Sequence, residues 1–325
     1  MKRLFAFLLA AALLCGVCTS LCGCGETEKE KGGLSVVVTV FPAYDWVMNV
    51  LGGETDADVT MLLDSGVDLH SFQPSAADVV KIVGCDLFVY VGGESDAWVA
   101  DTLREGGNEN RVVLNLLEVL GDAVLEEETV EGMEPEHEHE HEDGEEPEYD
   151  EHVWLSLRNA SVVVKAIRDA LTKLDAPNAG TYAANADAYL GKLSALDKQY
   201  RDAVEAGKRK LLLFADRFPF RYLADDYGLD YYAAFSGCSA ESEASFETVL
   251  FLAKKVDEAK LPVVLTLENS DGRIAQTVIA ATEHKDARVL AMDSLQSTTG
   301  KDAAGGKTYL SAMEHNLEVL KEALA

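Results

Sequence analysis

The sequence predicts an α/β protein of two lobes, each a mostly parallel sheet flanked by helices, with one long rigid helix joining the lobes. Short β-branched runs alternate with segments of helical periodicity, which is typical of βαβ units. The same alternation occurs twice, before and after a helical stretch near the middle of the 325 residues. This length suits roughly two domains, and an apolar content of 48% is enough to build their cores.

The chain begins with a targeting segment. Two basic residues precede the apolar run Leu4–Cys18, which is too short for a comfortable transmembrane helix and has the flanks of a signal peptide. The following LCGC resembles a bacterial lipobox, in which the cysteine becomes the lipidated first residue. We therefore expect residues 1–23 to be a lipoprotein signal peptide, Cys24 to carry lipid, and residues 24–33 to form a flexible tether.

We place an N-terminal α/β lobe at residues 34–175, a linking helix at 176–208 and a C-terminal α/β lobe at 209–325. The linking helix, Asn178 to about Ala206, is longer than a usual globular helix and has no clean heptad repeat, which favours a rigid connection over a coiled coil. The expected strands are Ser35–Val40, Asp58–Leu63, Asp86–Val91, Arg111–Leu114, Lys210–Ala215, Pro262–Glu268 and Ala287–Met292. The other expected helices are Tyr44–Leu51, Ser75–Val83, Ser95–Arg104, Ala160–Leu174, Ser245–Glu258, Gly272–Thr282 and Thr308–Leu324.

The charge is strongly negative, at −29, and it is unevenly distributed. Such a charge excludes a general nucleic-acid binder, because phosphate contacts need clustered basic residues. Residues 126–151 hold 15 acidic residues and no Lys or Arg, so we expect a disordered acidic loop. Within it, His137, His139 and His141 alternate with glutamates, a composition that also binds metal ions. We interpret these histidines as an auxiliary metal-binding loop.

Two isolated histidines give sharper signals. His70 lies in a loop punctuated by Gly and Pro after a predicted strand, and His152 lies between the acidic loop and a predicted helix. Ligands of open α/β folds gather in the crevice at the carboxyl ends of strands, where these loops should lie. Of the six cysteines, Cys85 and Cys238 remain outside the targeting segment and Cys24. They are too few for a disulfide scaffold and are not spaced as a metal-binding pair, so packing is the simpler role and a single bridge between them is the alternative.

Several segments together carry a resemblance to a known family. In order, they are TVFPAYDWV, LHSFQPSAADV, CDLFVY, the acidic His-rich insert, DEHVWLSLRNA, RYLADDYGL and LAMDSL. The sequence from about residue 35 to 325 resembles the zinc/manganese-specific solute-binding lipoproteins of bacterial ABC transporters. The resemblance implies two α/β lobes joined by one rigid helix, with one metal ion held between them. It also implies that His70 and His152 are ligands from the N-terminal lobe and that Asp293 is a ligand from the C-terminal lobe.

The third ligand of the family, normally His or Glu, does not carry over. Ungapped alignment places Arg217 there, which cannot bind a metal ion, and a shift of one residue places Asp216 at the end of the strand. We choose Asp216; pairing with Arg217 or capping the next helix is its alternative role. Glu268, at the end of another strand, is a further candidate, either as a ligand or as a partner that orients a histidine.

The donors point to zinc. Two imidazoles with one or two carboxylates suit Zn²⁺ and also accept Mn²⁺, whereas Ca²⁺ prefers six to eight oxygen donors. The His-rich loop favours zinc, and a carboxylate in place of the third histidine favours manganese. We predict Zn²⁺, with Mn²⁺ as the alternative.

The resemblance implies an extracytoplasmic receptor that is anchored in the cell membrane by lipid on Cys24 and delivers metal to an ABC permease. A zinc-dependent hydrolase is an alternative of a different class, although the sequence has no G-x-S-x-G or Walker motif. A surface adhesin or a zinc buffer of the same fold would differ from a receptor only in its partners. We expect a monomer with no catalytic residues.

Overall fold

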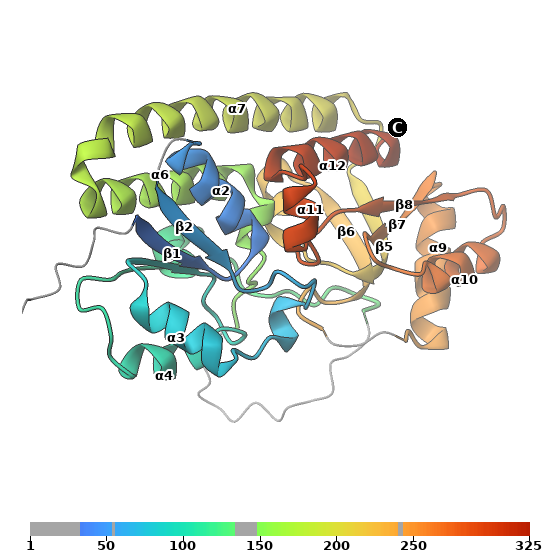
Figure 1. The fold of residues 1–325 in the computed structure, drawn as a ribbon. Helices are drawn as coiled ribbons and strands as arrows, with labels where there is room; N and C mark the ends of the chain where they lie inside the picture. The colour runs from blue at the N-terminus through green and yellow to red at the C-terminus, as the bar shows by residue number, and fades with distance from the viewer. Residues whose placement is uncertain (1–32, 54–55, 134–147, 240–242) are drawn as a thin grey trace, which may run out of the picture. The chain divides into compact units, whose positions relative to one another are not determined.

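The computed structural model describes residues 33–53, 56–133, 148–239 and 243–325, and it contains two parallel four-stranded sheets in succession along the chain (Figure 1). The predicted α/β class is thereby confirmed. The first sheet has the order β2-β1-β3-β4, with β1 Leu34–Val38, β2 Ala57–Met61, β3 Leu87–Tyr90 and β4 Val112–Asn115. The second has the order β6-β5-β7-β8, with β5 Leu211–Arg217, β6 Asp230–Phe235, β7 Val263–Leu267 and β8 Arg288–Met292.

Both sheets are built around apolar strands that are covered on both faces. All five residues of β7 are buried, as are the last three of β1, which is why these runs are almost continuously apolar rather than alternating. Every strand pair is parallel; Val38, for example, pairs with Met61 on one side and Val89 on the other. The carboxyl ends of the strands of each sheet therefore lie at one edge, from which the loops that carry polar residues emerge.

Strand β6 was not predicted from the sequence. Its residues, DYYAAF, contain no β-branched side chain, and the preceding Gly228 ends a short helix in the left-handed conformation. Pairing with β5 places β6 in the sheet, and the register of this pair shifts between Phe214 and Arg217. The irregularity lies at the end of β5, beside the candidate third ligand Asp216.

The longer helices follow the strands where sequence periodicity and N-cap residues predict them, whereas the short helices Leu116–Leu120, Arg221–Tyr227 and Gly300–Ala304 were not predicted. Ser75 caps α3 through a capping box with Asp78, and Ser156 and Ser245 cap α6 and α9. The α-helices are α2 Phe41–Leu51, α3 Ala76–Gly84, α4 Trp98–Arg104, α5 Leu116–Leu120, α6 Leu157–Leu174, α7 Ala179–Ala206, α8 Arg221–Tyr227, α9 Phe246–Ala259, α10 Arg273–Ala281, α11 Gly300–Ala304 and α12 Tyr309–Ala323. The 3₁₀ helices are η1 Leu69–Ser71, η2 Gly121–Ala123, η3 Val153–Leu155 and η4 Ala176–Asn178.

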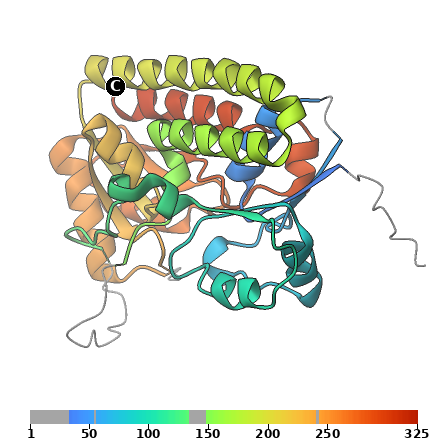
Figure 2. The same cartoon turned by 90° about the vertical axis from the view of Figure 1, so that its left-hand side faces the viewer.

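The long helix α7 has 28 residues and packs against helices from both halves of the chain. Figures 1 and 2 show it running beside α6 and α12. Tyr189 donates a hydrogen bond to the buried Asp45 of α2, at 3.0 Å, and Tyr200 donates one to the carbonyl oxygen of Met313 in α12, at 2.7 Å. A single helix is thus fixed to both lobes, as the sequence predicted.

The lobes also meet directly through a buried aromatic cluster. The rings of Trp46 and Tyr309 pack edge to face with their centroids 5.2 Å apart. The Tyr309 hydroxyl donates to the carbonyl oxygen of Trp154, and the Trp154 indole N–H donates to that of Ser294, at 2.7 and 2.9 Å. All three aromatic side chains are fully buried, so one apolar core is continuous between the lobes.

The targeting segment and residues 24–32 of the tether lie outside the described residues, as do Cys24, His137, His139 and His141. In the part of the chain that the structure describes, no helix combines the length and the apolar character needed to cross a bilayer.

Candidate metal centre

His70 is held by the loop that follows β2. The 3₁₀ helix η1 carries it, and Asp68 caps that helix by accepting a hydrogen bond from the backbone N–H of His70 at 3.1 Å. The neighbouring Leu69 is buried in the core and fixes the helix to the lobe. The imidazole is left 14% exposed, with Nδ1 2.8 Å from the Ser95 hydroxyl oxygen.

His152 is completely buried, and its imidazole is held on two sides. One carboxylate oxygen of Asp150 accepts from the backbone N–H of His152 at 2.8 Å and lies 3.1 Å from its Nδ1 atom. The Trp154 ring packs edge-on to the imidazole at a centroid distance of 5.4 Å. With Nδ1 engaged by a carboxylate, Nε2 is directed away from Asp150 as the atom available for a metal ion.

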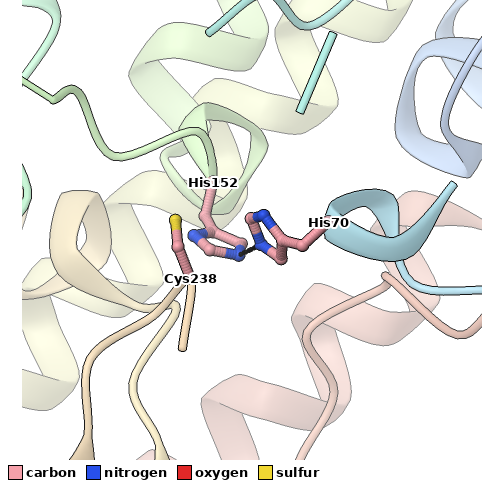
Figure 3. Close-up of side chains that lie close together, drawn as sticks. All are labelled: His70, His152 and Cys238. Carbon is pink, nitrogen blue, oxygen red and sulfur yellow. Dashed lines mark hydrogen bonds between the residues drawn. The ribbon is translucent and has the colours of Figure 1, made fainter. Parts of the chain in front are cut away.

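The Nε2 atoms of His70 and His152 lie 3.3 Å apart, although 82 residues separate them in the sequence (Figure 3). The Sγ atom of Cys238, from the loop after β6, completes a group whose ligand atoms all lie within 4.8 Å of one another. A cleft of about 760 Å³ opens beside this group and is bounded by residues of both lobes, among them Asp68 and Arg217. Two imidazole nitrogens and a thiol are donors that suit Zn²⁺.

Glu151 supports His70 from behind. Its Oε1 accepts from the backbone N–H of Ser95 at 2.9 Å, and its Oε2 lies 3.5 Å from His70 Nδ1. The side chain is only 4% exposed, and among the described residues Oε2 has no hydrogen-bond partner. Burial raises the pKa of Glu151. His152 is therefore fixed at Nδ1 by the Asp150 carboxylate, which increases its basicity as a ligand, whereas Nδ1 of His70 is fixed by the Ser95 hydroxyl with the Glu151 carboxylate nearby.

The pKa values of the two imidazoles are shifted in opposite directions. Burial, together with His152 and the Arg217 guanidinium, lowers the pKa of His70 to about 4. Burial would also lower the pKa of His152, but the carboxylates of Asp150 and Glu151 outweigh it, and the pKa of His152 is raised. A proton entering the pair therefore binds to His152, whereas His70 stays neutral and ready to bind a metal ion.

Cys238 is positioned by a short loop that packs against His152. A Cβ atom on Gly237 would lie 3.2 Å from the His152 ring, so the backbone approaches the imidazole closely there. The backbone N–H of Cys238 donates to the Glu127 carboxylate at 3.0 Å. Burial, reinforced by the Glu127, Asp150 and Glu151 carboxylates, raises the pKa of the Cys238 thiol. From the sequence, Cys238 was assigned only a packing role. Its position in the loop after a parallel strand could have indicated a binding role, but that strand, β6, was not predicted.

Asp216 lines the cleft but is not part of the cluster of His70, His152 and Cys238 among the described residues. One of its oxygens accepts from the backbone N–H of Arg217 at 2.9 Å, and the other from that of Leu267 at 3.2 Å. The neighbouring Arg217 donates from Nη2 to the Asp68 carboxylate at 2.7 Å and from Nη1 to the Ser239 carbonyl oxygen at 3.3 Å. At the position where the family resemblance expects a ligand, this chain has an arginine that ties the lobes together.

Asp293 and Glu268 also follow strands of the second sheet, outside the cluster within the described part of the chain. Asp293 forms an ion pair with Lys307 at 2.7 Å and accepts from the backbone N–H of Leu295 at 2.9 Å. Glu268 accepts from the hydroxyl and the backbone N–H of Ser294, at 2.9 and 2.8 Å, and it lines a smaller pocket with Asp216. In this conformation both carboxylates bind protein groups.

The two ends of the acidic segment are ordered next to the centre. Glu126 and Tyr149 form an antiparallel bridge, and the backbone N–H of Glu127 donates to the carbonyl oxygen of Glu148 at 2.9 Å. With His70, Ser95 and Cys238 on the other side, these ends line a second pocket of about 290 Å³. The acidic composition did not predict this pairing. The pairing places both ends of the acidic segment in the same pocket as His70.

A pair of facing imidazoles, on a chain with two α/β lobes joined by a long helix, is an arrangement of donors that can hold a small metal cation. In agreement, residues 36–323 match the sequence model of the ZnuA family, described as zinc-uptake complex component A, periplasmic. The chain belongs to this family.

Similar proteins cover most of the chain. The zinc-binding lipoprotein AdcA of Streptococcus pneumoniae serotype 4 is 33% identical over 318 residues, which is 95% of this chain and 60% of the relative. The high-affinity zinc uptake system protein ZnuA of Bacillus subtilis is 29% identical over 321 residues, covering 98% and 96% of the two chains. The crystal structure of the Zn(II)-bound ZnuA-like domain of S. pneumoniae AdcA superposes with a TM-score of 0.70 at 31% identity, over 90% of this chain and 99% of that one. The chain thus spans about 60% of the length of AdcA.

Proposed function

We propose that this protein is an extracytoplasmic receptor that captures Zn²⁺ in the interlobe cleft and delivers it to an ABC permease for uptake. The observation that carries the proposal is the pair of Nε2 atoms, 3.3 Å apart, on His70 and His152. Carboxylates lie behind both rings, at Asp150 and Glu151. Membership of the zinc-uptake family and the zinc-binding relatives support zinc as the cargo. Mn²⁺ remains the competing metal ion.

The remaining parts of the proposal follow from the sequence. Residues 1–23 act as a lipoprotein signal peptide, and lipid on Cys24 anchors the receptor to the membrane through the tether 24–33. Residues 34–175 and 209–325 form the two lobes, and 176–208 the linking helix. The receptor works as a monomer and has no catalytic activity of its own. Support for the anchor comes from the name of the S. pneumoniae relative, which is a lipoprotein.

Isothermal calorimetry with Zn²⁺ tests the proposal. Replacing either His70 or His152 by alanine should abolish tight binding, because each change removes one imidazole from a centre with few donors. His315→Ala is the matched control, since His315 lies on an exposed face of α12. Wild-type affinity in the His70→Ala or the His152→Ala protein, or the absence of a tight zinc site in the unmodified chain, would show the proposal to be wrong.

A further inference from the structure

We propose that the thiolate of Cys238 is the third protein ligand of this centre and that it makes the cleft selective for Zn²⁺ over Mn²⁺. The inference rests on the proposed function and names a residue that neither the sequence nor the family resemblance singled out. Its basis is the group formed by Cys238 Sγ and one ring nitrogen from each of His70 and His152, whose atoms all lie within 4.8 Å of one another (Figure 3).

The loop that carries Cys238 is fixed at the centre by contacts on three sides. Gly237 lies against the His152 ring, Glu127 holds the backbone N–H of Cys238, and the next residue, Ser239, accepts from Arg217. A side chain at position 237 would push the loop away from the imidazole. The thiol is thus presented to the histidines by the second sheet, so the metal ion receives donors from both lobes.

An anionic ligand in direct contact with the metal ion also fits the donors of this centre. Both imidazoles bind a metal ion as neutral groups, while Arg217 lines the same cleft as His70. The Asp150 and Glu151 carboxylates lie behind the imidazoles, where they offset part of the charge of a dication without touching the ion itself. A thiolate places one negative charge directly on the metal ion, and the Asp150 carboxylate places a second behind His152.

The carboxylates first considered for this role have other partners. Both oxygens of Asp216 accept backbone N–H groups, and Asp293 is paired with Lys307. Arg217 occupies the position of the missing ligand, and its pairing with Asp68 keeps it in the cleft. Cys238, from the neighbouring strand, supplies the missing donor.

The identity of this donor determines the metal preference. Thiolates are soft ligands that select zinc, whereas Mn²⁺ prefers carboxylate, carbonyl and water oxygens. With two imidazoles and one thiolate, the centre has the donor set of a three-ligand zinc site, which keeps a fourth position for water. We expect Mn²⁺ to bind this centre much more weakly than Zn²⁺.

Cobalt substitution reads the sulfur ligand directly. The experiment uses the full chain with Cys15, Cys18, Cys22 and Cys24 replaced by serine, which leaves two thiols, Cys85 and Cys238. Adding Co²⁺ should produce the near-ultraviolet charge-transfer absorption of a cobalt–thiolate bond. This absorption should persist in a Cys85→Ser variant, because Cys85 is buried in the first lobe, and disappear in a Cys238→Ser variant.

Affinities test the selectivity. Cys238→Ser should weaken zinc binding by more than about 100-fold, since loss of a ligand exceeds the loss of a group that only orients one. Cys238→Asp should restore part of the affinity and move the preference toward Mn²⁺. Circular dichroism establishes whether both Cys238 variants fold. If they do not, the cobalt spectrum of the Cys85→Ser variant still tests the inference, because Cys238 is then the one thiol left to bind the metal ion.

Three results would overturn the inference: tight zinc binding with no cobalt–thiolate absorption, an absorption that disappears with Cys85, or zinc affinity lost in Asp216→Asn and retained in Cys238→Ser. Each of them leaves the zinc receptor itself intact. Failure of the unmodified chain to bind zinc at all would instead refute the proposed function.

Discussion

The carboxylate behind His152 offers a sharp test of how this centre binds metal. We consider the substitution Asp150→Asn, which keeps the shape of the side chain and removes its charge. The Asp150 backbone stays anchored, because its carbonyl oxygen accepts from the Tyr222 hydroxyl at 2.7 Å and its N–H donates to the Leu125 carbonyl oxygen at 2.9 Å. The amide oxygen of asparagine can still accept from His152. The substitution therefore changes the electrostatics more than the geometry.

The magnitude follows from two opposing effects. A neutral partner makes His152 a poorer ligand, and loss of such a carboxylate costs about 10- to 100-fold in metal affinity, or about 1.4 to 2.7 kcal/mol. The Asp150 carboxylate also raises the pKa of His152, so at low pH it promotes the protonated form that cannot bind metal. Removing the charge lowers that pKa and weakens the competition from protons.

The difference in zinc affinity between the variant and the wild type should therefore depend on pH. At pH 8 the variant should bind Zn²⁺ about 10- to 100-fold more weakly than the wild type, because His152 has lost the carboxylate that strengthens it as a ligand. As the pH falls below the raised pKa of His152, the wild type loses affinity first, so the ratio of the two dissociation constants should decrease. Competitive titration with a zinc chelator between pH 8 and pH 5.5 measures this ratio.

A matched control is Asp226→Asn. Asp226 is a largely buried carboxylate that accepts from the Ser156 hydroxyl at 2.6 Å and contacts no histidine of the centre. It should leave the ratio near one at every pH. A ratio for Asp150→Asn that stays constant with pH, or equal affinities at pH 8, would refute the role assigned to Asp150.

Three further predictions concern stability and the acidic segment. Trp154→Phe removes the indole donor from the Ser294 carbonyl oxygen and should lower the free energy of unfolding by about 1 to 3 kcal/mol in urea titrations. Gly107→Ala should lower the free energy of unfolding by more than about 3 kcal/mol, because the φ of Gly107 is +105° and a Cβ there would lie 2.2 Å from a backbone oxygen. Gly228→Ala is the control: its φ is also positive but the space around it is open, so it should lower the free energy of unfolding by about 1 kcal/mol. Replacing residues 134–147 by a short Gly-Ser linker should leave one tight zinc site and remove weaker ones, as counted by native mass spectrometry; loss of the tight site would place a primary ligand in that segment.

Much of the fold could be predicted because its strands are short apolar runs. β1 and β7 consist mainly of Val, Leu and Thr, and their burial on both faces explains that composition. The strand β6 could not be predicted in this way, since its DYYAAF sequence has no β-branched residue and its pairing with β5 determines its conformation. Local sequence patterns identify strands that are rich in apolar β-branched residues. Strands of other composition form because they pair with a neighbouring strand, and local patterns do not identify them.

The candidate centre was predicted in part. His70 and His152 were chosen from their loops and from the family resemblance, and the structure places them in contact. Cys238 was missed because its position depends on β6, and the ligand roles of Asp216 and Asp293 stay predictions. The irregular end of β5, where the register shifts between Phe214 and Arg217, determines which side chain faces the cleft there, and no local pattern fixes such a shift.

The continuous aromatic core limits how the proposed receptor can release its cargo. Separating the lobes would expose the fully buried side chains of Trp46, Trp154 and Tyr309, each of which buries about 150 to 250 Å². At about 25 cal/mol per Å², opening this joint costs on the order of 10 kcal/mol, comparable with the whole unfolding free energy of a typical domain. Wide hinge opening is therefore too rare to serve each transport cycle. In the proposed receptor, release of the ion would therefore depend on local displacement of the loops at the mouth of the cleft, while the body that holds these three side chains stays rigid.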